Sequence, residues 1–231
     1  MRAAAITGIV GTVVAVILIC IVGFTKKPGE RCIGIFYDNK DVISSVAKAL
    51  HSYPDFEKVY TRIENYSSGE IERCQASFII NTEFENKIPR RLLEDYTHSE
   101  RNVAWLGYNI WQLGEHLEKN MGLRYIGAVS KAHEGSCDLF YRGRVSACSE
   151  RGLPLQLEFL PTNHVRIEIM AESRVRGGRE LTPYLVRSRN RFYMADVNFG
   201  SVFADFLSEL VGSPLRLKAE PSPSRRLVKG F

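Results

Sequence analysis

The sequence lacks the short motifs that carry the chemistry of common nucleotide-binding and hydrolytic enzymes. Neither G-x-G-x-x-G nor G-K-[S/T] stands at the end of a predicted strand, so no phosphate-cradling loop is expected. A nucleophile elbow, G-x-[S/C]-x-G, is also missing. The matching strand-to-helix turn, Gly107-Tyr108-Asn109, offers a phenol where such an elbow presents a hydroxyl or thiol. We therefore expect no enzymatic nucleophile at this turn.

The chain is equally poor in metal-binding patterns. It contains five cysteines and five histidines, but no C-x-x-C pair, and the histidines are scattered. Structural zinc sites use closely spaced pairs of such ligands. We expect no metal site and no cofactor.

The net positive charge of the chain lies almost entirely in its last nineteen residues. The formal net charge is +5, and the tail from Ser213 to Phe231 supplies +4 of it, from five basic residues against Glu220. A basic face on the rest of the chain is not indicated, so nucleic acid is not an expected partner. With Pro221, Pro223 and three serines, residues 213–231 read as a disordered basic tail, and contact with an anionic surface is the alternative.

Charge is absent from Ala3 to Phe24. As a helix this run would span roughly 33 Å, against about 30 Å for the bilayer core. A cleaved signal peptide fits less well, because the run is too long and no A-x-A site follows. A buried core helix also fits poorly, because the run is apolar all round. We expect a single membrane anchor in residues 1–25 and a linker in residues 26–30. Lys26, Lys27 and Arg31 after the run favour a cytoplasmic domain by the positive-inside rule.

Residues 31–212 alternate between apolar runs and helical patterns in their first half. Such alternation is typical of a parallel sheet covered by helices. Residues 69–74 read as a short helical or irregular link. We expect strands at Cys32 to Tyr37, Phe56 to Arg62, Ala76 to Asn81 and Asn102 to Leu106, and helices at Lys40 to Ser52, Pro89 to Tyr96 and from Asn109 to about Met121.

After Gly122 the pattern changes to alternating apolar and polar residues, which indicates half-buried antiparallel strands. Arg142-Gly143 is a candidate hairpin turn within Asp138 to Ala147. Further strands are expected at residues 155–159, 165–169, 183–187 and 192–195, followed by a helix over 202–210. The predicted fold is therefore α/β: a doubly wound, mainly parallel sheet with an antiparallel section, preceded by one transmembrane helix.

Four cysteines belong to this domain, because Cys20 lies in the apolar run. Cys32 and Cys74 stand near the starts of the first and third strands, which are neighbours in a common doubly wound order. Cys137 falls opposite Cys148 across the candidate hairpin. Two disulfides, Cys32–Cys74 and Cys137–Cys148, are conceivable and would suit an oxidising compartment. Four reduced, partly buried thiols are the alternative.

Polar residues gather where the predicted parallel strands end, and such strand ends converge at one edge of a sheet. One interpretation is a ligand site with carboxylate acceptors and an orienting amide. The alternative is that Asp38 or Asn39 caps the next helix and that Asn109 caps its own. The same two interpretations apply to Asp196, for which a cap or turn role is favoured. If the domain is instead a hydrolase or transferase, Asp38 and Glu83 are the carboxylates that would serve it. The candidate ligand-binding residues are Asp38, Asn39, Glu83, Tyr108 and Asn109.

Three segments resemble a known group of proteins. V-A-W-L-G-Y-N-I-W-Q-L (Val103 to Leu113), F-Y-R-G-R (Phe140 to Arg144) and Y-L-V-R-S-R-N-R-F-Y-M-A-D-V-N-F (Tyr184 to Phe199) look like the amino-terminal domain of uncharacterised bacterial proteins that carry a polysaccharide-deacetylase-like domain after it. The resemblance implies a fold like that of class I glutamine amidotransferases. It also implies an exported or cell-surface setting linked to polysaccharide.

The resemblance does not extend to deacetylase chemistry. Residues 213–231 are too few for that domain, and no Asp with His-x-x-x-His set occurs. We expect a membrane-anchored, non-catalytic envelope domain that binds a carbohydrate or a protein partner, such as a separately encoded deacetylase-like protein. The resemblance and the cysteines favour an extracytoplasmic domain, against the flanking lysines.

Overall fold

The computed structural model describes residues 31–128, 137–141, 144–148, 155–175, 178–197 and 200–212. Within them, nine strands form one mixed sheet in the order β2–β1–β3–β4–β11–β10–β9–β6–β7. Strands β2, β1, β3, β4 and β11 are parallel, and the remaining four are antiparallel to their neighbours. The parallel strands are β1 (Cys32–Tyr37), β2 (Glu57–Arg62), β3 (Ala76–Asn81), β4 (Asn102–Gly107) and β11 (Arg191–Met194).

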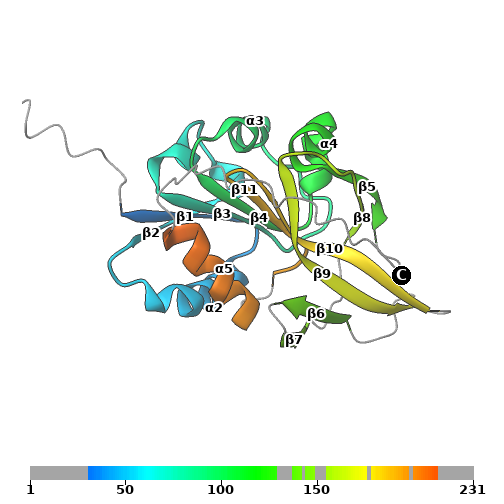
Figure 1. The fold of residues 1–231 in the computed structure, drawn as a ribbon. Coiled ribbons are helices and arrows are strands. Elements are labelled where there is room, and N and C mark those ends of the chain that lie inside the picture. The colour runs from blue at the N-terminus through cyan, green and yellow to red at the C-terminus, as the bar shows by residue number, and fades with distance from the viewer. Residues whose placement is uncertain are drawn as a thin grey trace, which may run out of the picture.

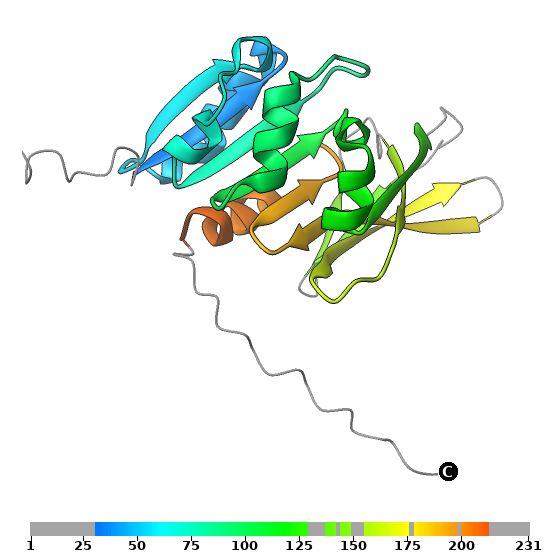
Figure 2. The same cartoon turned by 90° about the horizontal axis from the view of Figure 1, so that it is seen from above.

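Helices cover both faces of the sheet (Figure 1). On one face lie α2 (Ile43–Ala49), which the 3₁₀ turns η1 (Lys40–Val42) and η2 (Leu50–Ser52) extend, and α5 (Ser201–Gly212). On the other face lie α3 (Arg90–His98) and α4 (Glu115–Met121), which are seen side by side from above in Figure 2. Two further 3₁₀ turns, η3 (Ile63–Asn65) and η4 (Glu70–Arg73), connect β2 to β3. This two-sided cover explains why β1 and β3 are almost continuously apolar and buried.

The antiparallel half continues the sheet from β11. It contains β10 (Gly178–Ser188), β9 (Val165–Val175), β6 (Cys137–Tyr141) and β7 (Arg144–Ala147). The pairing of Tyr141 with Arg144 confirms the predicted hairpin register. Strand β11 pairs with β10 on one side and with β4 on the other, so it joins the two halves into one sheet.

The structure differs from the predicted elements at two places. The helix expected after the fourth strand is interrupted: the 3₁₀ turn η5 (Ile110–Leu113) ends at Gly114, whose φ of 58° and ψ of −132° break the helix before α4 begins. Residues after Gly122 also contain an unexpected strand. β5 (Leu123–Ala128) pairs with β8 (Leu155–Phe159) in a separate two-stranded sheet.

Cys32 and Cys74 form a disulfide, which is the pairing that the strand order made conceivable. It joins the start of β1 to the residue just after η4, across 42 residues of chain. Cys148 is also disulfide-bonded. The side chain of Cys137 lies outside the described part of the structure, so its pairing stays a prediction.

The predicted anchor, linker and basic tail all lie outside the described residues. Within the described ranges, no helix is long and apolar enough to cross a membrane.

Candidate functional site

The ends of β1, β3 and β4 meet at one edge of the sheet. We call the residues that follow these strands, Asp38–Asn39, Thr82–Glu83 and Tyr108–Asn109, the strand-end rim. Their backbones are tied together, because the Asp38 amide donates to the Ile80 carbonyl at 3.2 Å and the Tyr108 amide donates to the Asn81 carbonyl at 3.0 Å. The structure therefore brings all five predicted site residues to one edge.

The carboxylate of Asp38 is used within the rim. One oxygen accepts hydrogen bonds from the backbone amides of Thr82 and Glu83, both at 2.7 Å, and the other accepts from the Thr82 hydroxyl at 3.0 Å. Hydrogen bonds to an ionised carboxylate are among the stronger ones in proteins. Asp38 thus fixes the turn after β3, rather than presenting both oxygens to solvent.

Asn39 and Glu83 also make local contacts. The Asn39 side chain accepts from the Asp41 amide at 2.9 Å and caps η1, which is the capping role weighed as the alternative. The Glu83 carboxylate is exposed and accepts from the Asn86 side chain at 2.8 Å. Its backbone amide, not its carboxylate, contacts Asp38.

Asn109 does not cap its own helix through its side chain, so that alternative was wrong. Its backbone is left-handed, with φ of 68°, a region that asparagine tolerates better than most residues. The buried side-chain amide donates to the Glu83 carbonyl at 2.9 Å and holds the loop after β3 against η5. Gln112 adds to this: it accepts from the Ile88 amide at 3.0 Å and donates to the Asn86 carbonyl at 2.6 Å.

Beneath the rim, several buried polar groups have no hydrogen-bond partner among the described residues. They are both side-chain polar atoms of Asn81, the side-chain oxygen of Asn109 and the hydroxyl of Tyr193. Such groups cost free energy, and native proteins contain few of them. Nearby, the Tyr184 hydroxyl donates to Asp196 at 2.5 Å. Burial, together with the Asp196 charge, raises the pKa of both Tyr184 and Tyr193.

The rim also carries a continuous line of aromatic rings, which sequence reasoning missed. We call Tyr108, Phe84, Trp111 and Tyr125 the aromatic row. Ring centroids are 5.6 Å apart for Tyr108 and Phe84, 5.0 Å for Phe84 and Trp111, and 5.1 Å for the stacked pair of Trp111 and Tyr125. Phe84 is 41% exposed, and the other three are half-buried.

The two tryptophans therefore differ in their surroundings. Trp105 is fully buried against Tyr96 of α3, and its indole N–H donates to the Tyr108 carbonyl at 2.7 Å. It packs the sheet against a helix. Trp111 does not share that role, because it stands in the aromatic row with its face against Tyr125.

Solved structures share this fold. A catalytic mutant of a GH42 β-galactosidase from G. stearothermophilus aligns with a TM-score of 0.52 and 14% identity, over 78% of this chain and 29% of its own. A putative ThuA-like protein from Bacteroides uniformis aligns with a TM-score of 0.51 and 11% identity, over 81% and 91%. A glutamine amidotransferase from Methylobacillus flagellatus aligns with a TM-score of 0.48 and 12% identity, over 86% and 82%.

The fold resembles that of the ThuA-like protein and of part of the GH42 β-galactosidase. At these identities the likeness concerns the fold alone, and the chain spans less than a third of the β-galactosidase. No protein-family model matches the sequence, and no curated protein matches it either.

The turn that would carry a nucleophile in an elbow is occupied here by Tyr108, whose ring packs edge-on against Phe84. In the described ranges, no three His, Cys, Asp or Glu residues group closely enough to hold a metal ion. The chemistry that the rim does offer is a set of flat aromatic faces beside exposed polar groups.

Proposed function

We propose that this chain is a non-catalytic, carbohydrate-binding domain of the bacterial cell envelope, anchored to the membrane through Ala3 to Phe24. The observation that carries the proposal is the aromatic row. Its rings are partly exposed at the strand-end edge of an α/β sheet, where ligands of such sheets bind.

The row suits a sugar polymer by its chemistry. A pyranose ring has an apolar face of C–H groups, which packs on aromatic rings, and an edge of hydroxyls, which needs polar partners. Tyrosine and tryptophan supply a large, rigid contact surface and one polar group that can form a hydrogen bond. The exposed carboxylate of Glu83 stands beside Phe84 and can accept hydroxyl hydrogen bonds.

The loop that presents Phe84 is held in place before any ligand arrives. Asp38 binds its start at Thr82 and Glu83, while Asn109 and Gln112 bind Glu83, Asn86 and Ile88 farther along. A preorganised surface loses less conformational entropy on binding, which favours affinity.

The same contacts argue against the hydrolase or transferase alternative. Acid–base catalysis needs a carboxylate within reach of substrate. Three hydrogen bonds from Thr82 and Glu83 occupy the oxygens of Asp38, and Glu83 meets it only through its main chain. The rim therefore has no pair of facing carboxylates.

The envelope setting is supported by two observations. The disulfide between Cys32 and Cys74 is of the kind that persists in oxidising compartments. The sequence resemblance to domains that accompany polysaccharide-deacetylase-like proteins points to the same place.

The two tryptophans give a direct test, because only Trp111 lies on the proposed surface. The full-length chain in detergent is titrated with chito-oligosaccharides and a panel of bacterial envelope polysaccharides while tryptophan emission is recorded. Binding shifts the emission of Trp111 and leaves buried Trp105 unaffected. The Trp111→Phe variant should lose the signal, whereas Trp105 emission in that variant reports that the fold is intact.

A panel with no saturable signal, and no binding by calorimetry, would reject the carbohydrate proposal. Retention of a separately encoded deacetylase-like protein by the wild-type chain, lost in the Phe84→Ala variant, would assign the row to a protein partner instead. Time-dependent cleavage of a glycan, lost in Asp38→Ala, would restore the enzyme alternative.

A further inference from the structure

A pocket of about 440 Å³ lies at the opposite edge of the sheet from the aromatic row. It is formed where α3 ends, along α4, and at the turn between β10 and β11. Its lining contains several lysine, arginine and histidine side chains, and none of its nine described lining residues is acidic. The charged or titratable ones are His98, His116, Lys119, His164, Arg189 and Arg191.

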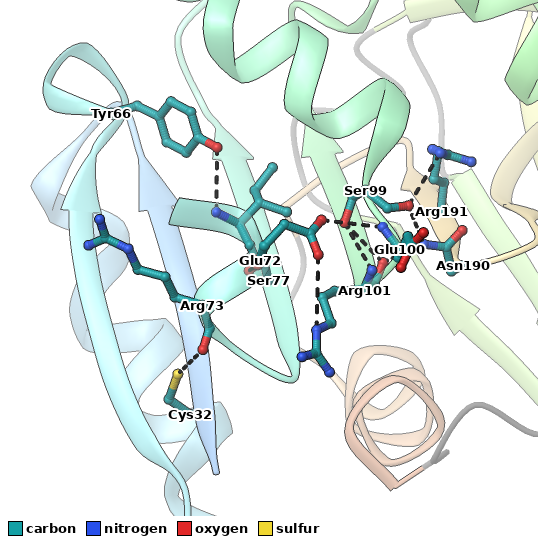
Figure 3. A network of polar contacts seen from close by, with 11 residues as sticks. Cys32, Tyr66, Glu72, Arg73, Ser77, Ser99, Glu100, Arg101, Asn190 and Arg191 are labelled. Carbon is teal, nitrogen blue, oxygen red and sulfur yellow. Dashed lines mark hydrogen bonds and ion pairs between the residues drawn. The ribbon is translucent and has the colours of Figure 1, made fainter. Parts of the chain in front are cut away.

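Arg191 is held rigidly at the pocket. Its Nε donates to the Tyr96 carbonyl at 2.9 Å. A terminal nitrogen donates to the Ser99 carbonyl at 3.3 Å (Figure 3). These partners are neutral carbonyls, so they orient the guanidinium without neutralising its charge. Glu72 is the acidic residue whose negative charge opposes the lowering of the pKa of Arg191 by burial, and its carboxylate also lies 4.0 Å from the Arg101 guanidinium.

Arg189 brings a second guanidinium beside the first. Its side chain is exposed and makes no ion pair among the described residues. Burial lowers the pKa of Arg191, and the positive charge of Arg189 lowers it further. Two like charges therefore share the pocket, and a bound anion would relieve their repulsion.

The backbone of Arg189 is itself unusual. Its φ is 57°, in the left-handed region that favours glycine, yet the turn carries a long cationic side chain. The neighbouring Asn190 fixes this turn, because its amide donates to the carbonyls of Ser99 and Arg101 at 2.8 and 2.5 Å (Figure 3). Glycine or asparagine would adopt this backbone conformation at a lower cost in free energy than arginine does.

The helices contribute further donors. His98 Nδ1 lies 2.8 Å from the Glu94 carbonyl, which can only accept, so Nδ1 donates its proton there and Nε2 donates to a pocket anion only in the imidazolium form. Its ring stands 6.4 Å from that of His116. Lys119 completes the side of α4, although Glu115 contacts its ammonium at 2.8 Å.

We propose that this pocket binds a phosphate-class oxyanion, either inorganic phosphate or the phosphate group of a sugar-sized ester. Guanidinium groups form paired hydrogen bonds to phosphate oxygens, and imidazole and ammonium groups add single donors. The volume exceeds that of phosphate alone and lies in the range of small-molecule sites. This site is independent of the proposed carbohydrate surface.

The test is calorimetric titration of the full-length chain in detergent at physiological salt. Inorganic phosphate, glucose 6-phosphate and glucose serve as probes. The two phosphate probes should bind one per chain and glucose should not, and tighter binding of glucose 6-phosphate than of inorganic phosphate would identify an ester as the ligand.

The decisive variant is Arg189→Gly. It removes one guanidinium and also relieves the positive φ, so the fold is expected to be retained while phosphate affinity falls about tenfold. The matched control is Arg62→Ser. Arg62 lies at the end of the edge strand β2 and forms an exposed ion pair with Glu64, so this variant removes one positive charge and should leave the affinity for phosphate unchanged.

His116→Gln, on the exposed side of α4, should weaken binding by a smaller factor. Absence of phosphate binding in the wild-type chain would overturn the proposal. Equal loss of affinity in Arg189→Gly and Arg62→Ser would also overturn it, because it would mean that only net charge matters.

Discussion

Replacing Gly107 with alanine tests the packing that creates the strand-end rim. Gly107 ends β4 with φ of 83°, and a Cβ added there would lie 2.2 Å from the carbonyl oxygen of Asn81 and 3.0 Å from the Val197 side chain. The obstacle is backbone on the adjacent strand, which cannot rotate away. The ends of β3 and β4 would have to separate.

The expected cost has three parts. A left-handed backbone costs an L-residue about 1–2 kcal/mol, and overpacking costs about 1–3 kcal/mol. Weakening the hydrogen bond from the Tyr108 amide to Asn81 adds about 1 kcal/mol. We expect Gly107→Ala to lower the free energy of unfolding by roughly 3–6 kcal/mol, a large share of a typical domain's stability.

Gly69→Ala is the matched control. Gly69 has nearly the same φ, 81°, but a Cβ built there has nothing within 4 Å. It should cost only the backbone part, about 1–2 kcal/mol. Urea unfolding of the full-length chain in detergent, followed by far-ultraviolet circular dichroism, measures both. If the two variants lose equal stability, the argument from the close approach of Gly107 to Asn81 is refuted.

Three further predictions concern buried polar groups and the disulfide. Tyr184→Phe removes the hydroxyl that donates to Asp196 and should cost about 1.5–3 kcal/mol in urea unfolding. Burial raises the pKa of Tyr184 in the folded protein. The stability that the protonated Tyr184 contributes is therefore complete below the unfolded-state pKa of about 10 and is lost as the pH rises above that value. Tyrosinate absorbance should accordingly appear together with unfolding. Cys32→Ser with Cys74→Ser should cost about 4 kcal/mol, from the entropy of a loop closed across 42 residues; an unchanged denaturation midpoint would contradict this.

The parallel half of the fold is predictable because its strands are short, continuous apolar runs bounded by polar residues. Cys32–Tyr37 and Ala76–Asn81 read this way in the sequence and occupy β1 and β3 with the same limits. The break at Gly114 and the strand β5 are less accessible. Leu123–Ala128 shows little alternation, and its pairing with β8 depends on residues about thirty positions away.

The strand-end residues could be located but not assigned roles. Convergence of Asp38, Glu83 and Asn109 follows from the parallel topology. Which group each one bonds depends on the loop after β3, whose path no local pattern specifies. The aromatic row illustrates the same limit, because Phe84 lies in that loop and Tyr125 lies in the unpredicted strand β5.

The basic pocket could not be predicted from the sequence for a related reason. Its residues come from α3, α4, the residue before β9 and the β10–β11 turn, and these segments lie far apart in the sequence. Net charge outside the tail is near zero, so composition gave no sign of a local positive site. Only the folded arrangement gathers the cations.

The central claim is that the aromatic row binds carbohydrate, and two exposed phenylalanines allow the most direct measurement. Phe84 in the row is 41% exposed, and Phe140 on β6 in the antiparallel half is 48% exposed. Calorimetric titration with the saccharide that wild type binds best should show affinity reduced about tenfold by Phe84→Ala, which corresponds to about 1.4 kcal/mol, and unchanged by Phe140→Ala. Equal affinity of the two variants would contradict the claim.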